Sequence, residues 1–256
     1  MNDFIKDAWD DQADKYRESH WASWGDSCAI SLEIDNISKY IKKGDIVLDA
    51  GCANGYSTFE QLKRNKIKIF GIDFSEKMIN YANAGKNENQ FGDQIDFYVG
   101  DIRTINFDDD FFNVTYTTRV LINLPHWDDQ LKGISECLRV TKKGGKVILS
   151  EAFWEPLILL NSLRSLKNLP PLIEHDFNRY LKKNKLEKFL NDSNLRYEIN
   201  DFSSIYYLGS RFLRELVTKV DDYPGYTNPI NEIFYNIEKE YSGGGFGIQQ
   251  AYIIYK

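Results

Sequence analysis

The stretch Asp45-Ile-Val-Leu-Asp-Ala-Gly-Cys-Ala-Asn-Gly55 decides the fold that this sequence predicts. It is a short apolar strand that runs into a carboxylate, two glycines and a polar turn. Continuous apolar strands are typical of parallel sheets, which are buried on both faces. Gly51 and Gly55 allow a sharp turn and a close backbone approach to a ligand, and Asp49 lies where open α/β sheets bind ligands. The pattern therefore predicts the cofactor end of a nucleotide-binding α/β domain.

The glycine spacing separates two kinds of adenosine-binding protein. Three residues lie between Gly51 and Gly55, so the G-x-G-x-x-G pattern that places a pyrophosphate on a helix amino terminus is not completed. The loop instead resembles the first motif of class I S-adenosylmethionine-dependent methyltransferases, Asp/Glu-x-Gly-x-Gly-x-Gly, with Ala53 at the middle glycine. The extra methyl group leads us to expect a loop slightly further from its ligand. The resemblance implies cofactor contacts from Asp49, Gly51, Cys52, Ala53 and Gly55.

A second strand that ends in a carboxylate follows at domain-scale spacing. Ile67-Lys-Ile-Phe-Gly-Ile-Asp73 ends where an acidic side chain meets ribose hydroxyls in nucleotide-binding domains. The next residues open a helix with Ser75 as its expected amino-terminal cap. The Gly-Ile-Asp-x-Ser-x-x-Met pattern is again similar to the methyltransferase family. Asp73 is thus the predicted ribose ligand, and the resemblance adds Phe74 and Met78 to the cofactor site.

Two further strands extend the match. The strand over 95–99 leads into Gly100-Asp-Ile102, where the family places a carboxylate on the adenine amino group and an apolar residue beside the ring. By resemblance these roles fall to Asp101 and Ile102. A strand over 113–117 leads to Arg119, which we include in the cofactor site.

The resemblance covers about residues 44–152 and implies S-adenosyl-L-methionine as the cofactor. It predicts an α/β fold: a Rossmann-like, seven-stranded, mostly parallel sheet with helices on both faces, an antiparallel last strand and helical lid insertions. We expect a single domain over 1–256 with these parts: an N-terminal helical cap (1–43), the cofactor-binding core (44–152), accessory lid segments (153–245) with a core strand near 197–201, and the final strand (246–256).

Aromatic residues near the amino terminus recur at helical spacing. Trp9, Ala13 and Tyr16 form an apolar stripe. In the resembling family such a helix often covers the cofactor, and the face of Tyr16 or Trp24 could shield the sulfonium. Docking of the helix on the sheet explains the rings equally well.

Composition narrows the partners. The net charge of −6 and the pI near 5.2 argue against nucleic-acid binding, which relies on Lys and Arg. The three cysteines are isolated, and no carboxylate cluster has the spacing of a metal site. The charged amino terminus does not resemble a secretory peptide, and no apolar run approaches a membrane span. We therefore expect a cytoplasmic enzyme without nucleic-acid partner, membrane insertion or metal.

Methyl transfer is an in-line displacement, so the protein must align nucleophile and methyl group and remove a proton from a hydroxyl acceptor. The position after the fourth strand where many related enzymes carry a histidine is Asn123, which can orient a hydroxyl but cannot accept its proton. His175 and Glu151 are the candidate bases, with a structural role open for each. Arg119 could bind an anionic acceptor or pair with a carboxylate of the protein.

Residues expected in the lid suit a polyhydroxylated acceptor, because amides and guanidinium groups bind hydroxyls and rings stack on sugars. The pattern resembles methyltransferases of surface-polysaccharide and sugar-modifying pathways and predicts O-methylation of a sugar or glycan. The alternatives are O- or N-methylation of a non-sugar metabolite and a catalytically silent cofactor-binding protein; the glycine spacing disfavours a nicotinamide oxidoreductase. The predicted substrate-binding residues are Asn123, Asn161, Arg164, Asn178, Tyr207 and Arg211.

Overall fold

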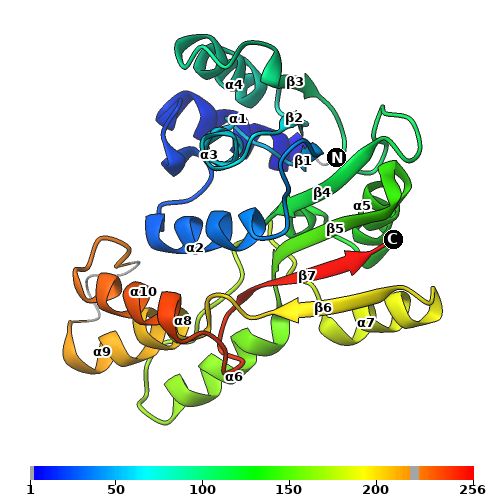
Figure 1. Cartoon of the computed structure of the whole chain (residues 1–256). Helices are drawn as coiled ribbons and strands as arrows, with labels where there is room; N and C mark the ends of the chain where they lie inside the picture. The colour runs from blue at the N-terminus through cyan, green and yellow to red at the C-terminus, as the bar shows by residue number, and fades with distance from the viewer. Residues whose placement is uncertain (1–2, 220–224) are drawn as a thin grey trace.

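A single sheet organises the computed structural model, which describes residues 3–219 and 225–256 (Figure 1). Its seven strands lie in the order β3-β2-β1-β4-β5-β7-β6. β7 runs antiparallel to both of its neighbours, β5 and β6, and the other described strand pairs are parallel. The strands are β1 (Ile46–Ala50), β2 (Lys68–Asp73), β3 (Ile95–Val99), β4 (Phe112–Thr118), β5 (Thr141–Ala152), β6 (Arg196–Asn200) and β7 (Gln249–Tyr255). The predicted fold class is confirmed.

Helices cover both faces of this sheet (Figure 1). The longer ones are α1 (Asp3–Tyr16), α2 (Ser27–Ser38), α3 (Tyr56–Arg64), α4 (Glu76–Glu88), α5 (Trp127–Val140), α6 (Trp154–Ser165), α7 (Lys183–Asp192) and α10 (Ile230–Glu240). Short turns complete them: η1 (His20–Ala22), η2 (Gly92–Gln94), η3 (Leu121–Asn123), α8 (Ser204–Leu208), the π-helical turn η4 (Gly209–Leu213) and α9 (Arg214–Val217). Residues 220–224 of the predicted accessory segment lie outside the described residues.

The central strands divide two hydrophobic cores because successive side chains of a strand point to opposite faces. Val47 joins the core beneath α2, α3 and α4, whereas Leu48 joins the core beneath α5 and α7. Both side chains are fully buried. The apolar run of β1 thus reflects helical layers on both sides.

The position of the site follows from strand order. The order reverses between β1 and β4, which both pair in parallel with their neighbours. Ligands of open α/β sheets bind at such a switch point, outside the carboxyl ends of the strands. The loop that follows β1 therefore stands between the ends of β2 and β4.

Local signals explain the helix boundaries near this edge. The Ser75 hydroxyl accepts a hydrogen bond from the Met78 N–H at 3.1 Å, so the predicted cap of α4 is confirmed. The insertion helix α6 begins at Trp154 and ends at Ser165, within the predicted accessory lid segments. Pro156 in its first turn needs no N–H partner, which is why the helix can start before it.

None of the helices in the described ranges is both long and apolar enough to span a membrane.

Candidate functional site

The loop after β1 depends on backbone conformations that favour glycine. Gly51 has φ +95° and Gly55 has φ +80°. A Cβ atom would lie 2.6 Å from the Val120 side chain at Gly51 and 2.8 Å from the Phe97 ring at Gly55. Ala53 also lies in the left-handed region, with φ +46°, at a cost of about 1–2 kcal/mol for an L-residue. The substitution at the middle glycine of the motif is therefore visible as backbone strain.

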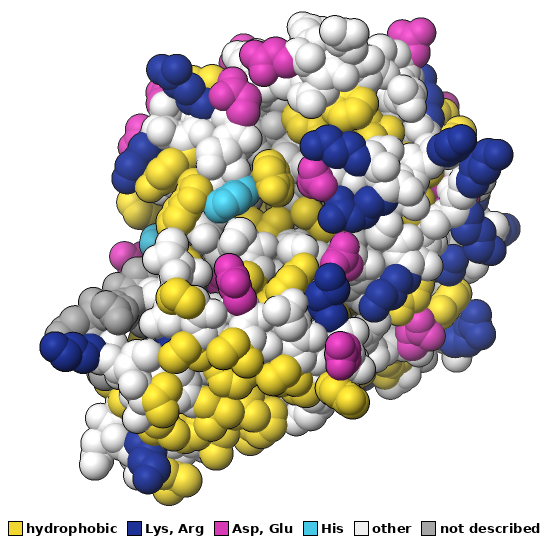
Figure 2. Space-filling model, turned by 60° about the vertical axis from the view of Figure 1, so that its left-hand side comes forward, with side chains coloured by type: hydrophobic (Ala, Val, Ile, Leu, Met, Phe, Trp, Pro, Cys, Tyr) yellow, Lys and Arg dark blue, Asp and Glu magenta, His cyan; other side chains and the backbone are white. Residues whose placement is uncertain are grey.

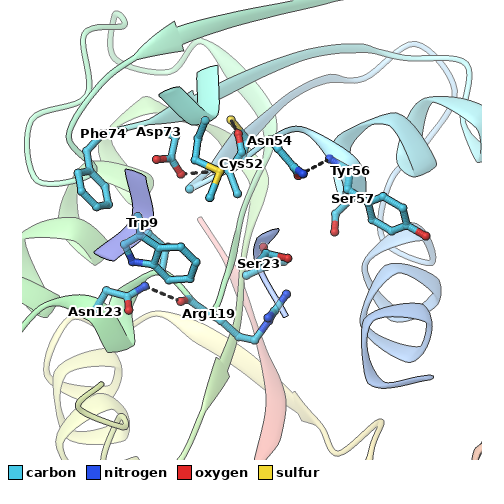
Figure 3. Close-up of a pocket in the computed structure, with 15 residues that line it drawn as sticks. Trp9, Ser23, Cys52, Asn54, Tyr56, Ser57, Asp73, Phe74, Arg119 and Asn123 are labelled. Carbon is cyan, nitrogen blue, oxygen red and sulfur yellow. Dashed lines mark hydrogen bonds between the residues drawn. The ribbon is translucent and has the colours of Figure 1, made fainter. Parts of the chain in front are cut away.

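A first cavity of about 580 Å³, including its open mouth, lies at the carboxyl ends of β1, β2 and β4 (Figure 3). The predicted residues Gly51, Cys52, Ala53, Asp73, Phe74, Met78, Arg119 and Asn123 line it, together with Trp9, Ser23, Asn54, Tyr56, Ser57, Thr118 and Val120. The structure thus brings most of the predicted cofactor site together.

Asp73 is the carboxylate that faces this cavity. Its Oδ2 accepts a hydrogen bond from the Ala53 N–H at 3.0 Å, and its Oδ1 accepts one from the Ser75 N–H at 2.9 Å. Each carboxylate oxygen has a second lone pair that can accept from a ligand hydroxyl. Asp73 therefore fixes the loop to the start of α4 and keeps acceptor capacity for the two hydroxyls of a ribose.

Buried carboxylates give the site an unusual electrostatic character. Burial raises the pKa of Asp73 to about 6 and the pKa values of Asp49 and Glu151 to about 7, and it also raises the pKa of Glu33. The Arg119 Nε donates to Glu33 Oε2 at 3.3 Å. Because burial penalises each ionised carboxylate, a positively charged ligand nearby would favour the ionised forms. Of these four carboxyl groups, Asp73 is the one that lines the first cavity.

Asp49 does not reach this cavity within the part of the chain that the structure describes. Its Oδ2 accepts hydrogen bonds from the Thr58 and Tyr116 hydroxyls, both at 2.7 Å. Asp49 thus ties the end of β1 to α3 through Thr58 and to β4 through Tyr116. Cys52 does line the cavity, but burial raises the pKa of its thiol well above the ordinary value, so it is a small loop residue and not a reactive thiolate.

The predicted adenine contacts are not assembled. Neither Asp101 nor Ile102 lies among the residues that line the first cavity, as far as the described residues show. The Arg103 Nε and Nη2 bind both oxygens of Asp101, at distances from 2.6 to 3.1 Å, and Ile102 is buried in the core beneath α5. The sequence pattern did not reveal that Arg103 would occupy this carboxylate. The geometry therefore gives the adenine assignment no support.

The amino-terminal helix contributes a residue that the sequence analysis did not place in the site. Trp9 lines the first cavity, whereas Tyr16 and Trp24, the predicted shields, line only the neighbouring cavity. The Trp9 Nε1–H is buried and has no hydrogen-bond partner among the described residues. The helical stripe of Trp9, Ala13 and Tyr16 was the available signal. In the view of Figure 3, Trp9 stands between Asp73 and the pair formed by Arg119 and Asn123.

Asn54 explains how this helix is held over the loop. Its Nδ2 donates to the carbonyl oxygens of Arg17 and Ser19, at 2.6 and 2.9 Å. The side chain is buried. The loop and the chain that covers it are therefore positioned as one unit.

A second cavity of about 1800 Å³, again including its mouth, adjoins the first. Trp9, Ser23, Arg119 and Asn123 line both. The Asn123 Nδ2 donates to the Arg119 carbonyl at 3.0 Å, which fixes the amide, and its buried Oδ1 has no partner in the described ranges. The Arg119 guanidinium stacks over the Trp24 ring at 4.9 Å. Polar groups of defined orientation thus mark the boundary between the cavities.

Aromatic and apolar side chains dominate the wall of the second cavity. Its predicted members are Tyr16, Trp24, His175, Asn178, Tyr207 and Arg211, and further rings and aliphatic groups come from Trp21, Ile122, Leu157, Leu172, Ile173, Phe177, Tyr180, Tyr226 and Ile248. The exposed His175 ring lies 4.2 Å from the Phe177 ring. Arg211 is ion-paired with Asp26 and stacks on Tyr207 at 5.2 Å. The Asn178 Oδ1 is buried and unpartnered within the described chain.

Three predicted residues have structural positions instead. The Glu151 Oε1 accepts from the backbone N–H groups of Val120 and Leu121, at 3.2 and 3.1 Å. Asn161 binds both backbone groups of Leu172, at 2.8 and 2.9 Å. Arg164 donates to the Pro170 carbonyl at 2.7 Å.

These contacts remove the three side chains from the reaction. None of Glu151, Asn161 and Arg164 lines either cavity in the part of the chain described. The geometry leaves Glu151 no access to an acceptor proton and gives the two predicted substrate contacts no support.

Comparison with known proteins assigns the family. A family of methyltransferase domains matches residues 41–204. The chain is 28% identical over 116 residues to the 27-O-demethylrifamycin SV methyltransferase of Amycolatopsis mediterranei, a match that spans 45% of this chain and 42% of that enzyme. It is 27% identical over 177 residues to the ubiquinone biosynthesis O-methyltransferase of Coxiella burnetii, over 66% of this chain and 72% of that enzyme.

Solved structures share the fold. A chain from the complex of the Haloferax volcanii Trm112 methyltransferase activator with a methyltransferase matches with a TM-score of 0.63, 16% identity and 96% coverage of both chains. Geranyl diphosphate C-methyltransferase from Streptomyces coelicolor A3(2) matches with a TM-score of 0.58 and 16% identity, over 88% of this chain and 78% of that one. The family match covers more than half of the sequence. The chain belongs to the class I methyltransferases, the Rossmann-like enzymes that take their methyl group from S-adenosylmethionine.

Proposed function

We propose that this protein transfers a methyl group from S-adenosylmethionine to a hydroxyl oxygen of a small organic molecule with a largely apolar or aromatic body. One observation carries the proposal: the first cavity shares Trp9, Ser23, Arg119 and Asn123 with an adjoining second cavity whose walls are mainly aromatic and apolar. Ligand pockets of this kind bind the body of a ligand by apolar contact, and a few polar groups fix its orientation.

The first cavity fits the cofactor. When bound, S-adenosylmethionine supplies an electrophilic methyl group on a positively charged sulfur. Asp73 would hold the ribose hydroxyls, and the buried carboxylates around the loop would compensate the positive charge. Arg119 would bind the carboxylate of the methionine end, because only its Nε is engaged by Glu33 among the described contacts. The buried Trp9 Nε1–H, which has no partner in the described ranges, offers a further donor.

At the boundary between the cavities, two residues would act on the acceptor. The fixed Asn123 Oδ1 would accept a hydrogen bond from a second donor group of the acceptor and so orient the reacting hydroxyl toward the cofactor cavity. His175, the histidine that lines the second cavity, would accept the proton.

The acceptor class rests on the composition of the wall and on the relatives. Two matched enzymes are named as methyltransferases of oxygen: one of 27-O-demethylrifamycin SV and one of ubiquinone biosynthesis. A saccharide acceptor is the second candidate, because Asn178, Tyr207 and Arg211 lie in the second cavity. Without Asn161 and Arg164, the polar contacts for several sugar hydroxyls are fewer than the sequence suggested.

The test uses isotopically labelled S-adenosylmethionine with a panel of three kinds of acceptor: phenols and catechols, apolar aliphatic alcohols, and nucleotide sugars or glycan fragments. Mass spectrometry would locate the label. We expect labelled oxygen in the first two kinds. Label confined to saccharides would show that the acceptor is a sugar, and label on nitrogen would show that the methylated atom is not oxygen. Cofactor binding without transfer to any acceptor would favour a catalytically silent binding protein.

A further inference from the structure

Hydrophobic side chains gather low on the molecule, over α6, α9 and α10 (Figure 2). These helices are neighbours, since η4 contacts all three. We call this surface the outer apolar face. The exposed fraction of its members ranges from 38% for Leu213 and Ile237 to 75% for Leu166. They are Ile158, Leu159 and Leu166 of α6 and the turn after it, Leu213 of η4, Leu216 and Val217 of α9, and Ile233, Ile237 and Tyr241 of α10 and its end.

Three charged residues of α6 and α9 point inward. Arg164 and Arg214 are 2% exposed and Glu215 is 6% exposed. The Arg164 Nη2 lies 2.8 Å from Glu215 Oε2, and the Arg214 Nη2 lies 3.3 Å from Glu215 Oε1. Taking three charges out of water has a desolvation cost that a buried ion pair often fails to recover.

In α9 this arrangement inverts the usual pattern of a surface helix, which buries its apolar residues and exposes its charges, whereas α10 keeps Glu232, Lys239 and Glu240 exposed. Leu216 and Val217 face solvent directly after the buried Arg214 and Glu215. Stability of the single chain does not explain the inversion. Burial of the outer apolar face by a partner does.

The size of the face indicates how large that partner surface is. From their exposed fractions, the nine side chains present on the order of 900 Å², compared with about 800 Å² contributed by each partner in a standard interface and with patches of about 300–600 Å² on ordinary monomers. The face is therefore large enough for a stable protein–protein interface.

Charge around the face favours a second copy over a membrane. The exposed charged residues on these segments have mixed signs: Lys167, Lys219, Glu232, Lys239 and Glu240. Membrane-surface binding relies on clustered Lys and Arg against anionic lipid, and the whole chain carries −6. A twofold axis instead lets acidic and basic rim residues of two identical faces meet.

We propose that two copies of this chain associate through the outer apolar face in a twofold-symmetric dimer. The dimer would also support the second cavity, because Leu213 lies on the face while Arg211, in the same π-helical turn, lines the cavity. Pairing would thus fix the wall that carries Arg211 and Tyr207.

The test measures molar mass by sedimentation and light scattering from about 1 to about 100 µM, concentrations that span micromolar dissociation constants. We expect wild-type protein at twice its chain mass of 29.8 kDa. Val217→Asp and, separately, Ile233→Lys place one charge per copy in the interface. Each should weaken dimerisation at least about 100-fold, because symmetry repeats every unpaired buried charge. Both positions are exposed in the single chain, so the circular dichroism spectrum should stay unchanged, and any fall in Tm should be confined to concentrations at which the wild type is a dimer.

Val99→Asp is the matched control, because Val99 is 56% exposed on β3, away from the outer apolar face. It should remain dimeric. A monomeric wild type over the whole range would overturn the proposal, as would dimers that survive both face substitutions or are lost in the Val99 variant. Flotation of a monomeric wild type with lipid vesicles would assign the face to a membrane and equally overturn it.

Discussion

The role of Asp73 can be tested by a change of one atom and one charge. Asp73→Asn keeps the shape of the side chain but removes the carboxylate that lines the first cavity and accepts from the Ala53 and Ser75 N–H groups. A hydrogen bond to a charged group contributes about 1.5–3 kcal/mol. Since about 1.4 kcal/mol corresponds to a tenfold change in affinity, loss of one such bond to ribose should weaken binding about 10- to 150-fold.

The assay is calorimetric titration with S-adenosylhomocysteine at pH 8, where Asp73, with its pKa raised to about 6 by burial, is ionised. Asp96→Asn is the matched control: Asp96 lies on the neighbouring strand β3 and pairs with Lys86 at 2.9 Å. The control should bind as wild type does.

Wild-type binding itself should weaken about tenfold for each pH unit below about 6, because the protonated carboxyl no longer accepts from both ribose hydroxyls. An Asp73→Asn affinity within about twofold of wild type, with the Tm unchanged, would refute the ribose assignment.

Three further predictions address strain, burial and proton transfer. Ala53→Gly should raise the free energy of unfolding by up to about 1 kcal/mol, because the backbone strain that it removes at φ +46° exceeds the conformational entropy that a glycine loses on folding. A lower free energy of unfolding in denaturant titrations would show that Ala53 is not strained. Burial raises the pKa of Glu151 to about 7 from 4.5, so its stabilising contribution is complete below pH 4.5 and is lost as the pH rises through 7. Glu151→Gln should therefore raise the Tm at pH 8 by several degrees, corresponding to about 2–3 kcal/mol. It should also flatten the fall in Tm between pH 4.5 and about 7, the ordinary and the raised pKa of Glu151, and leave turnover intact; lost turnover with intact folding would restore Glu151 as the base. His175→Gln should slow methyl transfer at least about 100-fold with unchanged S-adenosylhomocysteine affinity, since general-base catalysis contributes about 10²–10⁴-fold; a wild-type rate would give His175 a structural role.

Sequence alone determined the part of this protein whose signals are local. The apolar run of β1, the two glycines after it and the carboxylate at the end of β2 follow from local backbone requirements. Residue type and spacing therefore predicted the turn that Gly51 and Gly55 make and the place of Asp73 at the first cavity, although Gly55 does not line that cavity within the described residues. The same holds for the Ser75 cap of α4. These features repeat along a parallel sheet, and their order is enough to predict the fold.

Tertiary structure decided which polar side chains remain available. Glu151, Asn161 and Arg164 are the right residue types near the right edge, yet other groups of the chain engage them. The partners of Glu151 and Arg164, the Val120 N–H and the Arg211 carbonyl, are distant in sequence, whereas Asn161 binds Leu172, eleven residues on. Asp101 differs only in that a near neighbour, Arg103, takes its oxygens. Conversely, Trp9 enters the site because Asn54 fastens the amino-terminal segment over the loop, a contact that no periodicity encodes. Backbone conformation is a local property of sequence, whereas hydrogen-bond partners and exposure depend on what the fold brings alongside. For that reason the loop after β1 could be predicted as a unit, whereas the wall of the second cavity could be predicted only in part.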